Sequence, residues 1–292
     1  MKKRWQQFKA AVKMELREHK SSFIAYKVLH VLVVATLIRQ CVLGHFESVF
    51  FCVLTLLLLY VPSIVQVGLR IELPTTLEII ILCFIFAAEI LGEISSFYVR
   101  VPGWDTMLHT VNGFLAAAIG FSLVVLLNSD ERLTFDLSPA FMAVVAFCFS
   151  MTIGVLWEFF ECGMDLVFHT DMQKDTILHA IYTVALDPTR TNTVVGVTGI
   201  TDTAVNGESL GLGGYLDIGL LDTMKDLFVN FIGAVVFSII GYFYVKSRGK
   251  GKVASKFIPS RKEEGRDYLK AEQEKALPPE AEGREGRPDE GA

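Results

Sequence analysis

The chain contains few charged residues and few cysteines for its length, and each scarcity excludes a class of protein. Of its 292 residues, 20% are charged and 52% are hydrophobic, a balance that excludes a water-soluble domain of ordinary composition. The five cysteines form no CxxC pair, so neither a disulfide framework nor a zinc knot is expected. The first twenty residues lack an apolar core, and we therefore expect no cleavable signal peptide.

Long apolar runs make up most of the sequence. A helix needs about 20 predominantly apolar residues to cross a bilayer. Runs of this length lie near 24–44, 46–69, 75–97, 104–127, 139–168 and 222–246. The sequence therefore predicts an all-α fold, a six-helix transmembrane bundle that occupies residues 23–246.

The segments on either side of the bundle are polar and basic. In residues 1–22, Trp5, Phe8, Val12 and Leu16 recur at helical spacing among Lys and Arg, which predicts an amphipathic helix on an anionic cytoplasmic leaflet. Nucleic-acid binding is the competing interpretation, and the position just ahead of the spans disfavours it. Residues 247–292 are rich in Lys, Arg, Glu, Gly and Pro and are expected to form a disordered cytoplasmic tail.

The alternation of basic segments predicts the orientation of the bundle. Because Lys and Arg accumulate on the cytoplasmic side of membrane proteins, both termini are expected inside, and the connection 169–221 faces outward. That connection contains Asn206-Gly207 between β-branched residues. This pattern predicts a small extracytoplasmic β-hairpin.

The stretch GVLWEFFECGMD (154–165) is the most unusual part of the sequence. Its acids, Glu158, Glu161 and Asp165, fall within an arc of about 60° on one helix face. Each charge near the middle of a bilayer costs about 2.5 to 3.5 kcal/mol on insertion scales. Such groups are therefore expected to face a protein interior or a partner.

Three other spans present polar stripes at the same predicted membrane level. The polar residues are Glu89 and Glu93 at the end of the third span, Asp105, His109 and Asn112 at the start of the fourth, and Asp222, Asp226 and Asn230 at the start of the sixth. Asp105 and Asp222 are equally well placed as helix N-caps. The shared depth predicts that the stripes meet in one site.

Crowded acids in a low-dielectric site must take up protons or bind a cation. Oxygen ligands favour Mg, Ca or Mn, and an imidazole favours Zn. We favour a divalent metal over proton-sharing acids. The expected metal ligands are Glu93, His109, Glu158, Glu161, Asp165, Asp222 and Asp226.

A metal site at this depth predicts a hydrolase or transferase that acts on a lipid or lipid-linked envelope substrate. Asp105, His109 and Glu158 are the expected catalytic residues, and Arg39, Asn112 and Asn230 the expected substrate-binding residues. Two alternatives stay open. One is a cation- or proton-coupled transporter, and the other is a structural or sensory protein whose metal fixes helix packing.

Several of these stretches together resemble a known family. LGEISSFY (91–98), WDTMLHTVNGF (104–114), GVLWEFFECGMD (154–165), Met172-Gln173 and DTMKDLFVNFIGA (222–234) resemble the YjdF-like family of uncharacterised bacterial inner-membrane proteins. Asp105, His109, Glu158 or Glu161, Asp226, Asn230 and Gly233 are more faintly similar to the VanZ-like family. The resemblance implies a multi-pass protein of the bacterial inner membrane, and it implies no activity.

Overall fold

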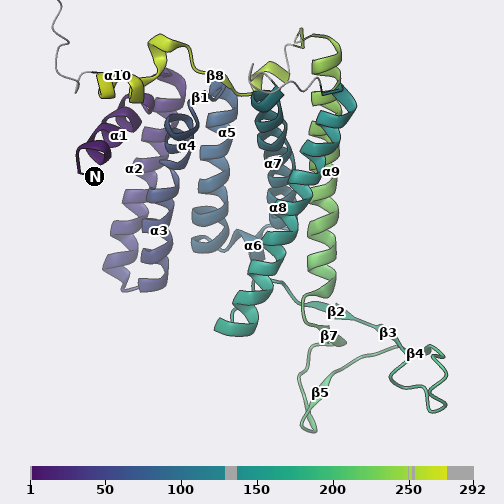
Figure 1. Ribbon diagram of the computed structural model, residues 1–292. Helices are drawn as coiled ribbons and strands as arrows, with labels where there is room; N and C mark the ends of the chain where they lie inside the picture. The colour runs from purple at the N-terminus through teal and green to yellow at the C-terminus, as the bar shows by residue number, and fades with distance from the viewer. Residues whose placement is uncertain (1, 129–136, 249, 252–253, 275–292) are drawn as a thin grey trace, which may run out of the picture. The chain divides into compact units, whose positions relative to one another are not determined.

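A computed structural model describes residues 2–128, 137–248, 250–251 and 254–274. The chain is mostly helical with short strands (Figure 1). It divides into two compact units. Unit 1 comprises residues 1–101, 125–135 and 247–292, and unit 2 comprises residues 102–124 and 136–246.

Unit 1 begins with a series of helices that are interrupted by short turns. Their bounds are α1 Lys2–Glu15, α2 Lys20–Leu43, α3 Phe46–Leu58, α4 Val61–Leu69, α5 Thr75–Phe86, η1 Ala87–Ile94 and α6 Phe97–Arg100. Gly44 ends α2 with a positive φ of 75°, a conformation that glycine adopts without steric cost. Pro62 occupies the first turn of α4, where its missing N–H leaves no hydrogen bond unmade.

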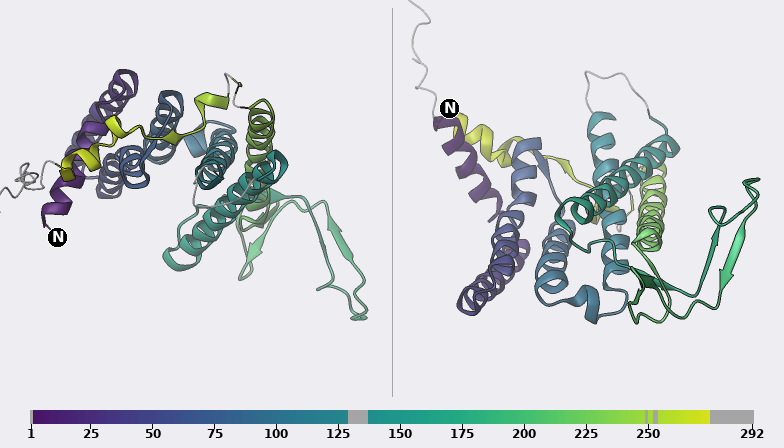
Figure 2. Two further views of the ribbon diagram at one scale, coloured as in Figure 1. Left: turned by 45° about the horizontal axis from the view of Figure 1, so that its top comes forward. Right: turned by 90° about the horizontal axis from the view of Figure 1, so that it is seen from below.

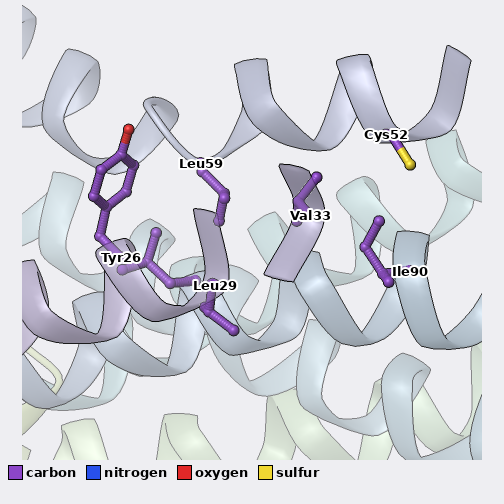
Figure 3. Packing of buried hydrophobic residues seen from close by; sticks show 7 residues of the cluster. Tyr26, Leu29, Val33, Cys52, Leu59 and Ile90 are labelled. Carbon is purple, nitrogen blue, oxygen red and sulfur yellow. The ribbon is translucent and has the colours of Figure 1, made fainter. Parts of the chain in front are cut away.

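An apolar cluster holds α2, α3, α5 and η1 together (Figure 3). It consists of Tyr26, Leu29, Val33, Cys52, Leu59, Leu82 and Ile90. Cys52 is fully buried and unpaired, as expected for a cysteine that packs as a small apolar side chain.

The basic N-terminal helix α1 contacts other parts of unit 1 with its apolar face. Ala11 and Val12 are buried against Val67 of α4, and Phe8 packs on the same cluster with Leu269 of the C-terminal helix α10. We expected this face to lie on the membrane. Part of this face instead packs on an apolar partner within the chain, the C-terminal segment, and the contact of α1 with the membrane stays a prediction. Trp5 remains 59% exposed.

The segment that follows unit 2 is ordered in part. It forms η2 Ala254–Lys256, β8 Ser260–Arg261, η3 Glu264–Arg266 and α10 Tyr268–Glu274. Strand β8 pairs antiparallel with β1 (Ile71–Glu72), and Lys262 forms a buried ion pair with Glu15 of α1. We expected disorder throughout 247–292. Ile258 is nevertheless buried, and Leu269 packs against apolar residues of α1 and α4. Residues 275–292 lie outside the described part of the chain.

Among the described residues, five helical segments are long and apolar enough to cross a membrane. They are Lys20–Leu43, Phe46–Leu69, Trp104–Leu127, Pro139–Phe168 and Leu220–Lys246. Six spans were expected. The remaining one, 75–97, is α5 followed without a break by the π-helix η1, so its regular helix is shorter than a full span.

Unit 2 contains three long helices, α7 Trp104–Asn128, α8 Pro139–Phe168 and α9 Leu220–Lys246. Ser138 caps α8 by accepting a hydrogen bond from the Phe141 N–H. Helices α8 and α9 pack along one another. Gly113 and Gly233 let α7 and α9 approach with their backbones nearly in contact, the arrangement that small residues permit in membrane helices.

The connection between α8 and α9 forms short antiparallel strand pairs, of which β2 and β7 lie near the start of α9 while β3, β4 and β5 extend away from it (Figures 1 and 2). The pairs are β2 Thr176–Leu178 with β7 Tyr215–Asp217, β3 Ala180–Thr183 with β4 Val195–Thr198, and β5 Ala204–Val205 with β6 Glu208–Ser209. Asn206 and Gly207 join β5 to β6 with φ values of 55° and 86°, the geometry of a type I′ turn.

Candidate metal centre

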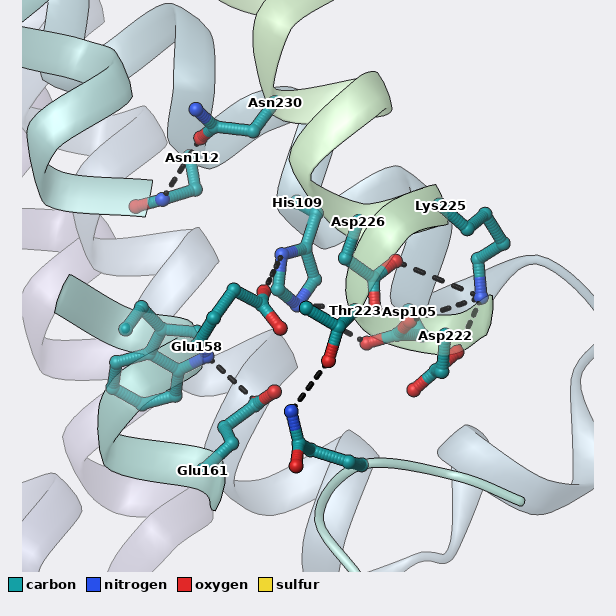
Figure 4. Close-up of polar contacts among 12 residues, drawn as sticks. Asp105, His109, Asn112, Glu158, Glu161, Asp222, Thr223, Lys225, Asp226 and Asn230 are labelled. Carbon is teal, nitrogen blue, oxygen red and sulfur yellow. Dashed lines mark hydrogen bonds and ion pairs between the residues drawn. The ribbon is translucent and has the colours of Figure 1, made fainter. Parts of the chain in front are cut away.

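His109 of α7 lies at the centre of a cluster of acids, and each of its ring nitrogens faces a different set (Figure 4). Its Nε2 atom is 3.4 Å from Asp105 Oδ1 and 3.9 Å from Asp226 Oδ2. Its Nδ1 atom is 3.7 Å from Glu158 Oε1. The imidazole therefore connects carboxylates from three helices.

The position of each acid follows from its place along its helix. Asp105 lies in the first turn of α7, Asp226 in the second turn of α9, and Glu158 two-thirds of the way along α8. Because α8 runs opposite to the other two, its C-terminal part meets their N-terminal turns. The sequence prediction that these stripes converge agrees with this geometry.

Lys225 supplies the positive charge on the Nε2 side of the imidazole. Its Nζ atom is 2.7 Å from Asp222 Oδ1, 3.5 Å from Asp105 Oδ2 and 3.6 Å from Asp226 Oδ1. The sequence did not identify Lys225 as a site residue, because its Cα lies about 100° from Asp226 on the helical wheel. The long, flexible lysine side chain nevertheless reaches the carboxylates of Asp105, Asp222 and Asp226.

Burial is deep on both sides of the cluster. The exposed fraction is 1% for Asp226, 4% for Glu158, 7% for Glu161 and 8% for His109. Within the described residues, both oxygens of Asp226 and Oε2 of Glu158 are buried without a hydrogen-bond partner. The Lys225 Nζ atom lies 3.6 Å from Asp226 Oδ1, and His109 Nδ1 lies 3.7 Å from Glu158 Oε1. Buried carboxylates without such partners are costly, so the site is suited to a proton or a cation.

Glu161 completes the Nδ1 side one turn beyond Glu158. Trp157 Nε1 donates a hydrogen bond of 2.7 Å to Glu161 Oε1, which fixes the carboxylate's orientation. Trp157 precedes Glu161 by four residues on α8 and so shares its face. That spacing was a signal in the sequence that our prediction did not use.

Two sets of ligand atoms in this cluster are close enough to hold a metal ion. One is Asp105, His109 and Asp226, and the other is His109, Glu158 and Glu161. In each set the ligand atoms lie within 4.8 Å of one another, compared with the roughly 3 to 4.2 Å between ligands that bind one ion at about 2.1 Å. Small side-chain rotations would suffice to close either set.

Asp165 does not belong to either set, although we expected it to be a ligand. Its Oδ1 accepts hydrogen bonds from Thr170 Oγ1 and Met172 N–H, and its Oδ2 accepts one from Gln173 N–H. Asp165 therefore stabilises the conformation of residues 170–173, the segment that directly follows α8. A carboxylate at the end of a helical stripe can bind backbone N–H groups of the next loop as readily as a metal.

Asp222 also accepts a hydrogen bond from the segment that follows α8. Its Oδ2 accepts a hydrogen bond of 2.9 Å from Lys174 N–H, and Gln173 Nε2 donates to Thr223 Oγ1. The N-terminal N–H groups of α9 use a different acid, since Asp217 Oδ2 accepts from Leu221 N–H. The loop and the acidic turn of α9 are thus bound together, and Asp222 is not the N-cap.

Asn112 and Asn230 lie deeper in unit 2 and bind each other. Asn112 Nδ2 donates to Asn230 Oδ1 at 3.3 Å, and Asn230 Nδ2 approaches Ser150 O at 3.5 Å. Asn230 is 1% exposed. We expected both amides to bind substrate, whereas their observed contacts join α7, α8 and α9.

Arg39 and Glu93, the remaining predicted site residues, belong to unit 1. Both side chains are exposed. The site described above is formed by unit 2 alone, so the proposed roles of Arg39 in substrate binding and of Glu93 in metal binding stay predictions.

Several apolar helices of spanning length, with a buried His and acid cluster in one bundle, define the protein as a multi-pass membrane protein. The chain belongs to the family described as "Predicted membrane protein (DUF2238)", which matches residues 25–247. No curated protein and no solved structure matches the chain. The family match contains every residue of the cluster.

Proposed function

We propose that the cluster binds one divalent metal ion on the Nδ1 side of His109, held by His109, Glu158 and Glu161. Two charge arguments favour this side. The Nε2 side already has the Lys225 ammonium within 3.6 Å of Asp105, Asp222 and Asp226. In the described part of the chain, no Lys or Arg lies within ion-pair distance of Glu158 or Glu161.

The single observation that carries the proposal is the different surroundings of the two ring nitrogens. A metal ligand at Nδ1 requires the ring proton on Nε2, and Asp105 Oδ1 lies 3.4 Å from Nε2 to accept it. Metal-binding histidines usually donate their second N–H to a carboxylate, which fixes the ring and its tautomer. Asp105 has this positioning role in our proposal.

Three protein ligands leave a coordination position for water or substrate, which is the arrangement of catalytic rather than structural zinc sites. A bound divalent ion would lower the pKa of water to about 7 and polarise a phosphoryl or acyl oxygen. Glu158 Oε2, buried and without a hydrogen-bond partner in the described residues, is placed to take a proton. Lys225, with 46% of its side chain exposed, is placed to bind a phosphate.

On these grounds we infer a hydrolase or transferase that acts on a lipid or lipid-linked envelope substrate. The cluster lies near the helix ends that carry the 169–221 connection, which suits a substrate whose reactive group is at the head-group level. We also infer that α5 and η1 form a sixth span and that both termini are cytoplasmic, because basic residues accumulate there. The likeness to the YjdF-like and VanZ-like families supports a bacterial inner membrane.

Metal analysis of the purified protein tests the site. We expect about one ion per chain in the unmodified protein and at least a tenfold loss of affinity in Glu161→Gln and His109→Ala. Asp171→Asn is the matched carboxylate control, since Asp171 is 65% exposed on the same side of unit 2. A Glu161→Gln protein that is well folded and keeps its metal would contradict the assignment.

The second candidate function is proton or cation transport. The specific observation that favours it is the carboxylate, imidazole, carboxylate sequence from Asp226 through His109 to Glu158, a geometry suited to proton transfer. Deeper in unit 2, however, the described buried side chains are apolar, such as Phe121 and Phe237, or neutral, such as Ser122 and Ser150. None of them is ionisable, which disfavours a chain of titrating groups. Proton flux into liposomes without bound metal would favour this candidate.

A further inference from the structure

Gln173, in the segment that follows α8, is held in place on both sides of its backbone. Asp165 Oδ2 accepts a hydrogen bond from the Gln173 N–H. Gly219 directly precedes α9 with a φ of 93°, and a Cβ atom at this glycine would be 2.6 Å from the Gln173 Cβ. These contacts set the point from which the Gln173 side chain extends.

The Gln173 side chain binds Thr223 in the first turn of α9. Its amide Nε2 donates a hydrogen bond to Thr223 Oγ1. A hydroxyl group has one proton to donate and two lone pairs that accept. The Thr223 hydroxyl, which accepts from Gln173, therefore still has its own proton for another acceptor.

The acceptor beside this hydroxyl is the carboxylate of Glu158. Figure 4 shows the Thr223 hydroxyl next to the Glu158 carboxylate, with the hydrogen bond from the Gln173 amide drawn as a dashed line. Glu158 Oε2 is buried without a hydrogen-bond partner in the described part of the chain. Because such an oxygen is costly, a small rotation that brings it onto the Thr223 proton is favourable.

The geometry points to Gln173 and Thr223 as positioning residues of the metal centre, and the inference rests on the metal site proposed above. Gln173 orients the Thr223 hydroxyl, which donates to Glu158 Oε2 and directs Oε1 to the ion. Oε1 is the oxygen that lies 3.7 Å from His109 Nδ1. Carboxylates that bind metals are usually held by such outer hydrogen bonds. Oε2 has two lone pairs, so it can accept from Thr223 and still take a proton.

Titration of the full chain with Co²⁺ in detergent, after a chelator has removed other metals, tests this role. Thr223→Val removes the hydroxyl at nearly constant volume and should weaken Co²⁺ binding about 10-fold or more. It should also change the visible absorption bands of the bound ion. Thr223→Ser restores the hydroxyl and should bind within about twofold of the unmodified protein. The matched control is Thr152→Val, since Thr152 is exposed on α8 and its hydroxyl donates to Cys148 O.

A double-mutant cycle shows whether Gln173 acts through Thr223. Gln173→Leu alone should weaken Co²⁺ binding about threefold or more, and it should cause no further loss when Thr223→Val is already present. Additive losses would overturn the role of Gln173. Unchanged affinity in Thr223→Val would overturn the whole inference and leave the metal centre intact, whereas an unmodified protein that binds no Co²⁺ would overturn both. Thermal midpoints of the metal-free variants exclude unfolding as the cause.

Discussion

Gly113 of α7 lies against the backbone of Asn230 of α9 so closely that a Cβ atom at residue 113 would be 2.1 Å from the Asn230 carbonyl oxygen. Gly233 makes the reciprocal approach, and its Cβ would be 2.1 Å from Thr110 O. These two glycines set the distance between the helices that carry His109 and Asp226.

We therefore expect Gly113→Ala and Gly233→Ala to destabilise unit 2 by at least about 1 to 3 kcal/mol, the usual cost of overpacking. A backbone contact cannot rotate away as a side chain can. The measurement is the thermal midpoint in detergent. Gly163→Ala on α8 is the control, since nothing lies within 4 Å of a Cβ there, and it should leave the midpoint unchanged. Equal midpoints for all three variants would refute the close crossing.

Trp157 should affect metal affinity without binding metal. Trp157→Phe keeps an aromatic ring but removes the N–H that donates to Glu161 Oε1. Loss of such an orienting partner typically lowers metal affinity about 10- to 100-fold. Competition with a chelator measures the change, and Trp5→Phe, a substitution of an exposed tryptophan in unit 1, is the control. An unchanged affinity would mean that Glu161 is not a ligand.

The buried pair Glu15–Lys262 should respond differently to single and double substitution. Lys262→Met leaves the Glu15 carboxylate buried without its cation, which costs roughly 3 to 5 kcal/mol. The double variant Glu15→Leu, Lys262→Met removes both charges and should regain most of that stability. Arg266→Met is the control, since Arg266 is 47% exposed and such pairs contribute about 1 kcal/mol or less.

Limited proteolysis of the C-terminal segment gives the readout for this pair. We expect cleavage within 254–274 to be fastest in Lys262→Met. The double variant and Arg266→Met should resemble the unmodified protein. If the double variant is cleaved as fast as Lys262→Met, the ion pair itself holds the segment and the argument from desolvation fails.

Asp187 organises a loop outside the membrane spans and predicts a pH effect. A hydrogen bond from the Thr189 hydroxyl, together with N–H donors of Thr189, Thr191 and Thr193, lowers the pKa of the Asp187 carboxyl to about 2. Because the folded pKa lies below its usual value of 3.8, the contribution to loop stability is present above pH 3.8 and is lost as the pH falls through 2.

The amide NMR signals of Thr189, Thr191 and Thr193 should therefore titrate together with a midpoint near pH 2. In Asp187→Asn that step should be absent, and trypsin should cleave after Arg190 several-fold faster at neutral pH, because the side chain accepts fewer hydrogen bonds. Glu208→Gln in β6 is the control for a carboxyl in the same connection. A midpoint near 3.8 would contradict the hydrogen-bonded loop.

The sequence predicts the part of the site that depends on helical periodicity. Asp105 and His109, and Glu158 and Glu161, share faces because they are three or four residues apart. The cost of acids in apolar helices then requires these faces to meet. Both arguments need only the spacing of residues along a helix and the cost of charges in a membrane, and both can be worked out from a single sequence.

Other features depend on contacts that periodicity does not encode. Asp165 and Glu161 occupy the same predicted stripe, yet only the path of the chain after α8 decides that Asp165 binds backbone N–H groups. Composition suggests disorder for the C-terminal segment, whereas Leu269 packs on a cluster that includes Val12 and Val67, more than 200 residues earlier in the chain. The side-chain reach of Lys225 is likewise a tertiary property.

The two ends of the long connection between α8 and α9 lie close together. Thr176 and Asp217 are directly paired across β2 and β7, and Gln173 and Lys174 are already bonded to the first turn of α9. Everything between residues 178 and 215 is therefore a detachable appendage. Its length can grow or shrink without displacing Asp222 or Asp226, so a shortened chain that retains this root should preserve the centre beneath it.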